Sequence, residues 1–175
     1  MLRWLAVCCT GLMFFIGGHG AQAVDHPDLS GTWCLDLKTP GANSMDALLR
    51  AQGLSWAERK AAQTMPMLQT ISQKNDVLTI RIQSLIRNHS ETVFLDGSSQ
   101  IRDVERLGKV ETHSSWSKDG TSAVTIVNFN MPDGRKAKWT SRRYLSEDQM
   151  KMIVDHLLSI SDGQKITGKR VFIRQ

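Results

Sequence analysis

Cysteine is scarce in this sequence, and its positions exclude a fold held together by disulfides. Cys8 and Cys9 lie in an apolar N-terminal segment, and Cys34 is the only other cysteine. If the N-terminal segment is removed, Cys34 has no partner for an internal disulfide. The fold must therefore depend on a hydrophobic core, and Cys34 is expected to be a small apolar packing residue.

Local motifs of metal centres and of enzymes are also missing. The histidines are scattered with no H-x-x-x-H spacing, and there is no C-x-x-C pair, so no metal site is expected. Asp155 and His156 are adjacent on a predicted strand, where consecutive side chains point to opposite faces, so they cannot form a catalytic pair. We predict a protein that is not an enzyme, has no metal and no cofactor, and carries its histidines at the surface.

No block of one charge sign is present. The chain has 22 basic and 17 acidic residues, a formal net charge of +5 at pH 7, and these residues are spread along the sequence. The lack of a Lys/Arg cluster argues against a nucleic-acid partner. A mildly basic surface could attract anionic ligands or lipid headgroups, and such a surface often serves only solubility.

The long apolar run at the N-terminus predicts export. Arg3 precedes the uncharged stretch Leu5 to Gly17, and the small residues Ala21-Gln22-Ala23 follow it, as a signal peptidase requires. The stretch is shorter than the roughly 20 residues of a membrane span. We expect residues 1–23 to be a signal peptide cut after Ala23, and the protein to be secreted or periplasmic. An uncleaved anchor is the alternative.

The rest of the chain predicts a single domain. Residues 24–175 contain no repeat, no low-complexity stretch and no linker rich in Pro, Gly or Ser. Their number suits one domain that buries most of its apolar surface. We expect a monomer.

Two short helices are predicted within the segment Ser44 to Met65. Gly53 interrupts the segment where a helix C-cap would lie, and Pro66 ends it. Ser55 and Glu58 have the spacing of a capping box at the start of the second helix. Each helix is only modestly amphipathic, so the pair should cover another element rather than form a bundle of its own.

Short alternating segments separated by turn residues make up the remainder and predict ten strands. Turn formers such as Asp96-Gly97 and Asp162-Gly163 suit tight hairpins between consecutive strands. The predicted strands are Ser30 to Leu37, Met67 to Gln73, Val77 to Ser84, Asn88 to Leu95, Gln100 to Arg106, Lys109 to Ser117, Ser122 to Asn128, Lys136 to Tyr144, Gln149 to Leu157 and Gln164 to Arg174.

A meander of this length exposes two sheet edges unless it closes on itself. We therefore predict an all-β fold, an up-and-down closed antiparallel β-barrel of about ten strands with a helical lid between the first two strands. Several strands carry polar residues on both faces. This pattern indicates either loosely patterned strands or a partly polar cavity, and the lid favours the cavity.

Specific residues resemble the fatty-acid-binding-protein family of lipocalin-like (calycin) β-barrels. Gly31-Thr32-Trp33 matches the G-x-W start of these barrels, and the segment Leu49 to Pro66 is similar to the family's lid. Asp76 to Arg81, then Ser84 and Arg87-Asn88, follow the family pattern D-x-x-T-I-R, S and K-N. The resemblance covers nearly the whole chain after residue 23. It implies non-enzymatic binding and transport or buffering of a fatty acid or other hydrophobic small molecule.

The resemblance also implies a ligand site. Members that bind a carboxylate use R-x-Y on the last strand, which corresponds here to Arg170-Val171-Phe172, together with an earlier arginine. That arginine falls on Arg143, with the neighbouring Arg142 as the alternative because it would face the opposite side. Phe172 lacks the tyrosine hydroxyl, which departs from the family pattern. The predicted ligand-binding residues are Arg143, Arg170, Phe172, Trp56 on the lid, Ile86 at the portal turn and Met152.

Two further expectations follow from the resemblance. Arg174 is similar to the basic residue that caps the G-x-W tryptophan, so it should contact Trp33. The helical lid could make transient contact with a membrane. The alternative to a carrier is an interaction module whose barrel is filled by its own side chains and whose surface contacts a protein or an envelope component.

Overall fold

The computed structural model describes residues 26–85, 88–104, 107–131 and 133–175. The predicted signal peptide and the predicted portal residue Ile86 lie outside the described residues. The elements are β1 (Gly31–Leu35), α1 (Asp46–Ala51), α2 (Trp56–Thr64), β2 (Met67–Lys74), β3 (Val77–Ser84), β4 (Asn88–Phe94), β5 (Asp96–Val104), β6 (Gly108–Trp116), β7 (Ala123–Asn130), β8 (Lys136–Leu145), β9 (Lys151–Ile160) and β10 (Lys165–Arg174).

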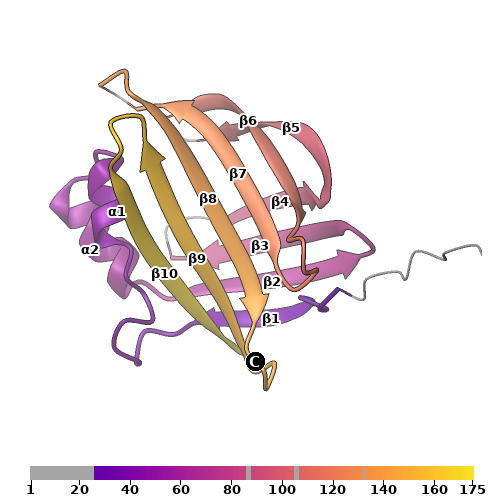
Figure 1. Ribbon diagram of the computed structural model, residues 1–175. Helices are drawn as coiled ribbons and strands as arrows, with labels where there is room; N and C mark the ends of the chain where they lie inside the picture. Colours follow the sequence, from indigo (N-terminus) through magenta and orange to yellow (C-terminus); the bar gives the residue numbers. More distant parts are fainter. Residues whose placement is uncertain (1–25, 86–87, 105–106, 132) are drawn as a thin grey trace, which may run out of the picture.

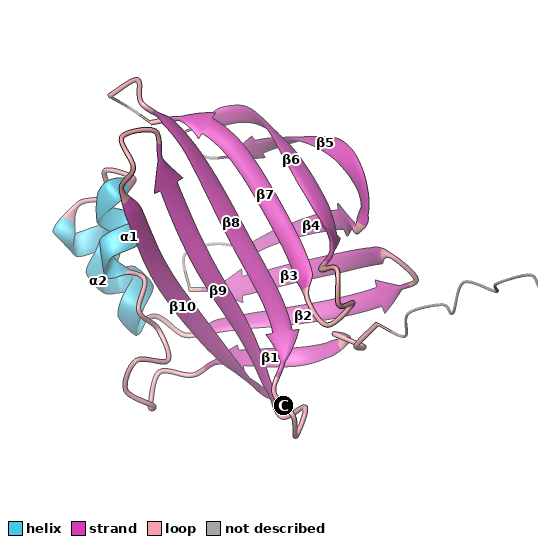
Figure 2. Ribbon diagram, in the orientation of Figure 1, coloured by secondary structure: helices cyan, strands magenta, loops and turns pink. Residues whose placement is uncertain are grey.

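The strands form one antiparallel ten-stranded sheet in the order β4-β3-β2-β1-β10-β9-β8-β7-β6-β5. The first and last strands of the chain pair with each other, with Trp33 opposite Arg174. The sheet curves into a barrel, as Figure 1 shows, and both helices lie together on one side of it (Figure 2). The predicted all-β barrel of ten strands with two helices between β1 and β2 is confirmed.

The barrel is not closed by backbone pairing between β4 and β5, the two ends of the sheet order. Only Leu95 separates these strands, and Asp96 and Gly97 belong to β5. Leu95 is 3% exposed, and its N–H donates to the Asp76 carbonyl in the β2–β3 turn at 2.6 Å. The chain therefore turns a corner into the core, and the predicted hairpin at Asp96-Gly97 is wrong.

Side chains bridge this seam instead of the backbone. The Arg102 guanidinium on β5 lies 2.6 Å from the Glu91 carboxylate on β4 and donates to the Thr92 carbonyl at 3.1 Å. The Gln100 amide donates to the Phe94 carbonyl at 3.3 Å. The seam is therefore held by polar side chains that also reach the barrel interior.

One predicted strand boundary is wrong because of turn geometry. The sequence pattern predicts a strand that begins at Gln149, but the Gln149 backbone has a φ of 55°, and its N–H donates to the Ser146 carbonyl at 2.8 Å. It therefore belongs to the β8–β9 turn, and β9 begins at Lys151.

The main core closes the end of the barrel where the C-terminus lies (Figure 1). Trp33, Met152 and Phe172 are fully buried there. The Trp33 indole donates to the Leu29 carbonyl at 3.0 Å, and the Arg174 guanidinium lies 4.2 Å from the centre of the Trp33 ring. The expected contact between Trp33 and Arg174 is confirmed, and it is a cation–π contact.

The two helices are held to the barrel to different degrees. α1 packs Leu48 and Leu49 into a second cluster of buried residues that includes Leu158 and Ile160. α2 has no buried residue and begins with the predicted Ser55 capping box, which is confirmed. α1 is therefore part of the core, whereas α2 contributes only the partly buried Ala62 to this cluster.

Two polar residues fasten α2. The Arg59 guanidinium lies 2.9 Å from the Asp46 carboxylate of α1. The Asn43 amide donates to the carbonyls of Ala62 and Gln63 at 3.2 Å each, which satisfies acceptors that a helix end leaves unpaired. Asn43 also bridges to Arg170 on β10 through its backbone. The C-terminal turn of α2 is thus tied to the strand that carries Arg170.

Close packing of α1 on β10 requires a glycine, and this generates a prediction. A Cβ at Gly168 would lie 2.4 Å from the Leu48 Cδ1 atom and 3.0 Å from the Met45 Sδ atom. We expect Gly168→Val to lower the free energy of unfolding by about 1–3 kcal/mol through overpacking, as measured by urea denaturation. Leu48→Ala in the same chain should recover part of the loss.

The matched control is Thr167→Val, which places the same valine side chain at the neighbouring exposed position of the same strand. If Gly168→Val and Thr167→Val change stability equally, the contact between α1 and β10 does not limit the side chain at residue 168.

Candidate functional site

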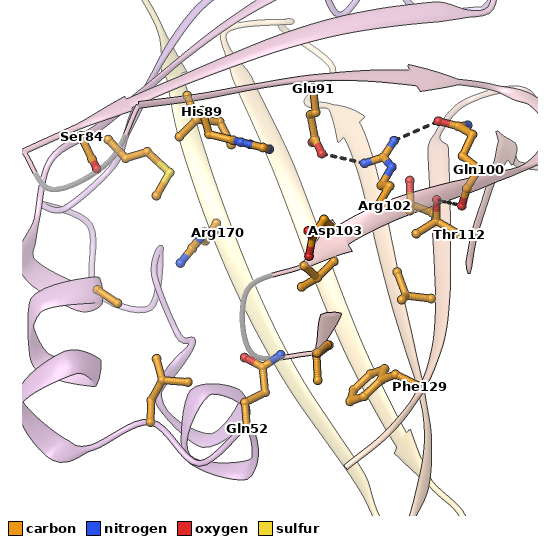
Figure 3. A pocket seen from close by; sticks show the side chains of 18 of the residues that line it. Gln52, Ser84, His89, Glu91, Gln100, Arg102, Asp103, Thr112, Phe129 and Arg170 are labelled. Atoms are coloured by element: carbon orange, nitrogen blue, oxygen red, sulfur yellow. Dashed lines mark hydrogen bonds and ion pairs between the residues drawn. The ribbon is translucent and has the colours of Figure 1, made fainter. Parts of the chain in front are cut away.

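The barrel encloses two adjoining cavities, an outer chamber of about 1230 Å³ and an inner chamber of about 260 Å³. The outer chamber lies under α2 and reaches toward the β5–β6 turn, and Figure 3 shows part of its lining. The two chambers adjoin at the residues that line both, which are Ile82, Glu91, Arg102, Thr125, Val127 and Arg170.

Apolar side chains dominate the outer chamber. α2 contributes Ala61, Ala62 and Met65, and the opposite wall contributes Val127 and Phe129 of β7. A chamber of this size and lining can take a flexible apolar group such as an acyl chain.

The inner chamber has a polar end. Arg143, Arg170, His156, Ser141 and Gln69 line it together with apolar residues of the core. Such a combination of an apolar chamber and a few convergent polar groups is typical of a site for an amphipathic ligand.

Strand register brings the two arginines to the same row. Arg143 on β8 and Arg170 on β10 are both directly opposite Val154 of β9. Directly opposed residues point to the same face, and Val154 is 4% exposed in the core. Both guanidinium groups are therefore directed to the interior, separated by one strand, while Arg142 pairs with Asp155 and is exposed.

Neither arginine has a full set of partners in the described part of the chain. The Nε atoms of Arg143 and Arg170 are shielded from solvent and make no hydrogen bond. Burial lowers the pKa of both groups. Figure 3 shows Arg170 projecting into the cavity with no bond drawn to its neighbours, whereas Arg102 is joined to Glu91 and Gln100. The inner chamber thus carries positive charge that is poorly compensated.

Glu91 compensates this charge only in part. Its carboxylate opposes the lowering of the Arg143 pKa by burial, but the same carboxylate forms the 2.6 Å ion pair with Arg102. Since Arg102 also lowers the Arg143 pKa, the Glu91–Arg102 pair adds little net negative charge. An anion is the group that this chamber is best suited to receive.

His156 lies inside the barrel, one step along β9 from the arginine row. It is opposite Ser141 of β8 and Gly168 of β10. Burial lowers the pKa of His156 to about 3, with further lowering by Arg170 and Arg143. The prediction that the histidines lie at the surface is wrong for His156, and the signal was its alternation with the apolar residues Val154 and Leu158.

A hydrogen-bonded chain orients the His156 ring. The Trp139 indole N–H donates to Ser141 Oγ at 2.8 Å, and Ser141 Oγ lies 2.9 Å from His156 Nδ1. The indole N–H occupies one acceptor site of the Ser141 hydroxyl, whose own O–H is free to donate. We assign this O–H as the donor to Nδ1, which places the proton of the neutral imidazole on Nε2. An imidazole with such a low pKa is a weak base near pH 7, so Ser141 and His156 are poorly suited to nucleophilic catalysis.

Of the other predicted ligand residues, the structure places some in the wall of a chamber and others outside it. Phe172 lines the inner chamber and is fully buried. Met152 is opposite Phe172 but is fully buried in the core and does not line either chamber. Trp56 is 70% exposed and lines neither chamber, because α2 directs Ala61, Ala62 and Met65 inward.

Sequence reasoning missed two residues of the polar end besides His156. Ser141 and Gln69 lie on β8 and β2 at positions that alternate with other inward side chains, as Arg143 and Ile71 do. This period of two was available in the sequence, but polar residues occur on both faces of these strands. The alternation alone therefore did not identify the interior face.

Among the described residues, no group of three or more His, Cys, Asp or Glu side chains could hold a metal ion. The helices of the described segments are too short or too polar to cross a membrane.

The predicted barrel fold is found in solved structures as well. Human cRBP IV superposes with a TM-score of 0.64 at 24% identity, over 85% of this chain and 99% of that protein. The REP1-NXSQ fatty acid transporter gives 0.62 at 17% identity, over 84% and 96%, and a point mutant of it gives 0.62 at 18%, over 84% and 98%. No family model and no curated protein matches the sequence. The similarity therefore defines the fold.

The buried His156 generates a prediction about pH. Its pKa is about 3 in the folded protein and near 6.5 when unfolded, so between these values the unfolded state binds more protons and stability decreases as the pH falls. We expect the His156 ring resonances to show no titration between pH 8 and 5 in NMR spectra. As the pH falls through this interval, the free energy of unfolding should decrease less for the variant His156→Asn than for the wild type.

The control for this measurement is His89→Asn, at an exposed position of β4. A His156 resonance that titrates near pH 6.5 would contradict the burial of a neutral imidazole beside the arginines.

Proposed function

We propose that the protein binds an amphipathic small molecule, with its apolar part in the outer chamber and an anionic group against Arg143 and Arg170, and carries or buffers it without chemical conversion. A fatty acid is the simplest such ligand. The observation that carries the proposal is the pair of solvent-shielded Nε atoms without partners at the inner end of an apolar cavity.

Electrostatics supports an anionic head. Taking a charged group out of water costs several kcal/mol unless an opposite charge and hydrogen bonds compensate it. Arg143 and Arg170 have no such compensation from the described residues beyond the shared Glu91. A carboxylate would supply it, because guanidinium and carboxylate groups match in charge and in planar geometry.

The family resemblance implies a tyrosine hydroxyl at position 172 that would contact the ligand, and Phe172 has no hydroxyl. In this proposal the Nε2–H of His156 supplies a neutral donor to the same chamber. Two positive donors and one neutral donor then surround the anionic group. The fatty acid transporter of similar fold supports a lipid ligand by analogy.

The alternative function required a barrel filled by its own side chains. The described residues instead leave chambers of about 1230 and 260 Å³. This observation supports a small-molecule carrier over the filled interaction module.

Removal of the charged groups tests the site. We expect Arg143→Met and Arg170→Met each to weaken palmitate binding by about 10- to 100-fold, the range for a lost hydrogen bond to a charged group of about 1.5–3 kcal/mol. Binding of hexadecanol, which has no charge, should change little. Because each substitution removes a poorly compensated buried charge, the free energy of unfolding should stay equal or increase. Isothermal titration calorimetry and urea denaturation measure the two effects.

Arg142→Met is the matched control, since Arg142 is the neighbour of Arg143 on the outer face. It should leave palmitate binding unchanged. If Arg143→Met and Arg170→Met destabilise the fold without a selective loss of palmitate, the two arginines are structural and the proposal fails.

Export is a second element of the proposal. It is supported by the signal-peptide pattern of residues 1–23, and the ligand would then be carried in the periplasm or outside the cell. Expression in the native host should give a mature protein that begins at Val24. N-terminal sequencing of the purified protein measures this. Recovery of the full-length chain from the cytoplasm would contradict export.

Membrane contact through the lid is supported by exposed apolar side chains. Trp56 at the start of α2 is 70% exposed, and Leu85, which directly follows β3, is 83% exposed. Amphipathic side chains such as tryptophan favour the membrane interface. Transient contact of these residues with a donor or acceptor membrane stays a prediction. The monomeric state of the protein also stays a prediction.

A further inference from the structure

Gln69 is the strongest feature of the interior that an anionic ligand does not explain. It lies on β2 between Trp33 of β1 and Ile82 of β3, is 4% exposed, and lines the inner chamber together with Arg143, Arg170 and His156. Its Oε1 atom is shielded from solvent and has no hydrogen-bond partner in the described structure.

The surroundings of Gln69 orient its amide. The Nε2 atom lies 3.9 Å from the Sδ atom of Met67, and a thioether sulfur can only accept a hydrogen bond. The NH₂ group is thus turned to Met67, which leaves the carbonyl oxygen as the free group. An acceptor buried without a partner costs free energy, and a donor that reaches it recovers that cost.

The other acceptors named in the inner chamber are engaged. Ser141 Oγ accepts from the Trp139 indole and contacts His156, and the Glu91 carboxylate is paired with Arg102. The Arg143 and Arg170 Nε atoms are themselves without partners, so they do not satisfy Gln69. The chamber therefore presents both positive donors and one free acceptor.

We propose that the ligand carries a hydrogen-bond donor close to its anionic group, as a hydroxyl near the carboxylate of a fatty acid does. This inference rests on the proposed function, because Arg143 and Arg170 are taken to hold the carboxylate. A plain fatty acid anion has only acceptors in its head and leaves Gln69 Oε1 unpaired. A 3-hydroxy fatty acid supplies the missing O–H, and the inner chamber of about 260 Å³ has room for more than a carboxylate.

The experiment compares three ligands of equal chain length by calorimetry: palmitate, 3-hydroxypalmitate and 3-methoxypalmitate. The methoxy acid has an oxygen at the same place but cannot donate. We expect the wild type to bind 3-hydroxypalmitate about 5- to 20-fold more tightly than either of the others.

Gln69→Met is the matched variant, since it keeps the length of the side chain and removes both polar atoms. It should bind 3-hydroxypalmitate and palmitate with equal affinity, mainly because 3-hydroxypalmitate binding weakens to the level of palmitate when its O–H loses the acceptor. Circular dichroism and the melting temperature of the ligand-free variant show whether it folds. If it does not fold, Gln69→Leu and the three-ligand comparison on the wild type still test the proposal.

The outcomes separate this inference from the function on which it rests. Equal wild-type affinity for palmitate and 3-hydroxypalmitate, with palmitate binding still dependent on Arg170, overturns the inference and leaves the proposed function intact. Preference for the methoxy acid would show that Gln69 presents its NH₂ group, which also overturns it. Failure of all three acids to bind overturns the proposed function itself.

Discussion

Burial of two positive charges on either side of Val154 is the constraint on which the interior of this protein depends. Arg143 and Arg170 both oppose Val154 and have solvent-shielded Nε atoms without partners. Placing them inside is unfavourable for folding, so other parts must compensate. The core around Trp33 and Phe172 closes one end of the barrel and supplies the apolar burial that offsets this cost. The proposed binding site is thus maintained at the expense of stability.

The rest of the barrel keeps this site accessible. The seam between β4 and β5 is closed by the Arg102–Glu91 ion pair, whose members line both chambers. At the helical side, α1 is anchored in the second core, whereas α2 buries no residue and is fastened through Asn43 and Arg59. Elements with few buried apolar contacts are those that open most easily, which makes α2 the part of the wall best suited to admit a ligand.

Particular residues show how far sequence reasoning reached and where it stopped. The capping box at Ser55 and the contact of Trp33 with Arg174 follow from local patterns or from the family resemblance, and both are present. Trp56 was assigned to the cavity because it lies on the lid, yet its side chain is exposed. Helix orientation depends on which face packs against the barrel, and a weakly amphipathic nine-residue helix does not specify that face.

The sequence by itself determined the class of fold, since hairpin turns, period-two alternation and a helical pair after the first strand allow few other arrangements. Only the tertiary structure decided which residues meet in the interior. Arg143 and Arg142 differ by one position, and their faces were settled by pairing with Val154 and Asp155. Gln69 joined the site through contacts between distant strands. Register is a long-range property, and a one-residue shift inverts every side chain of a strand.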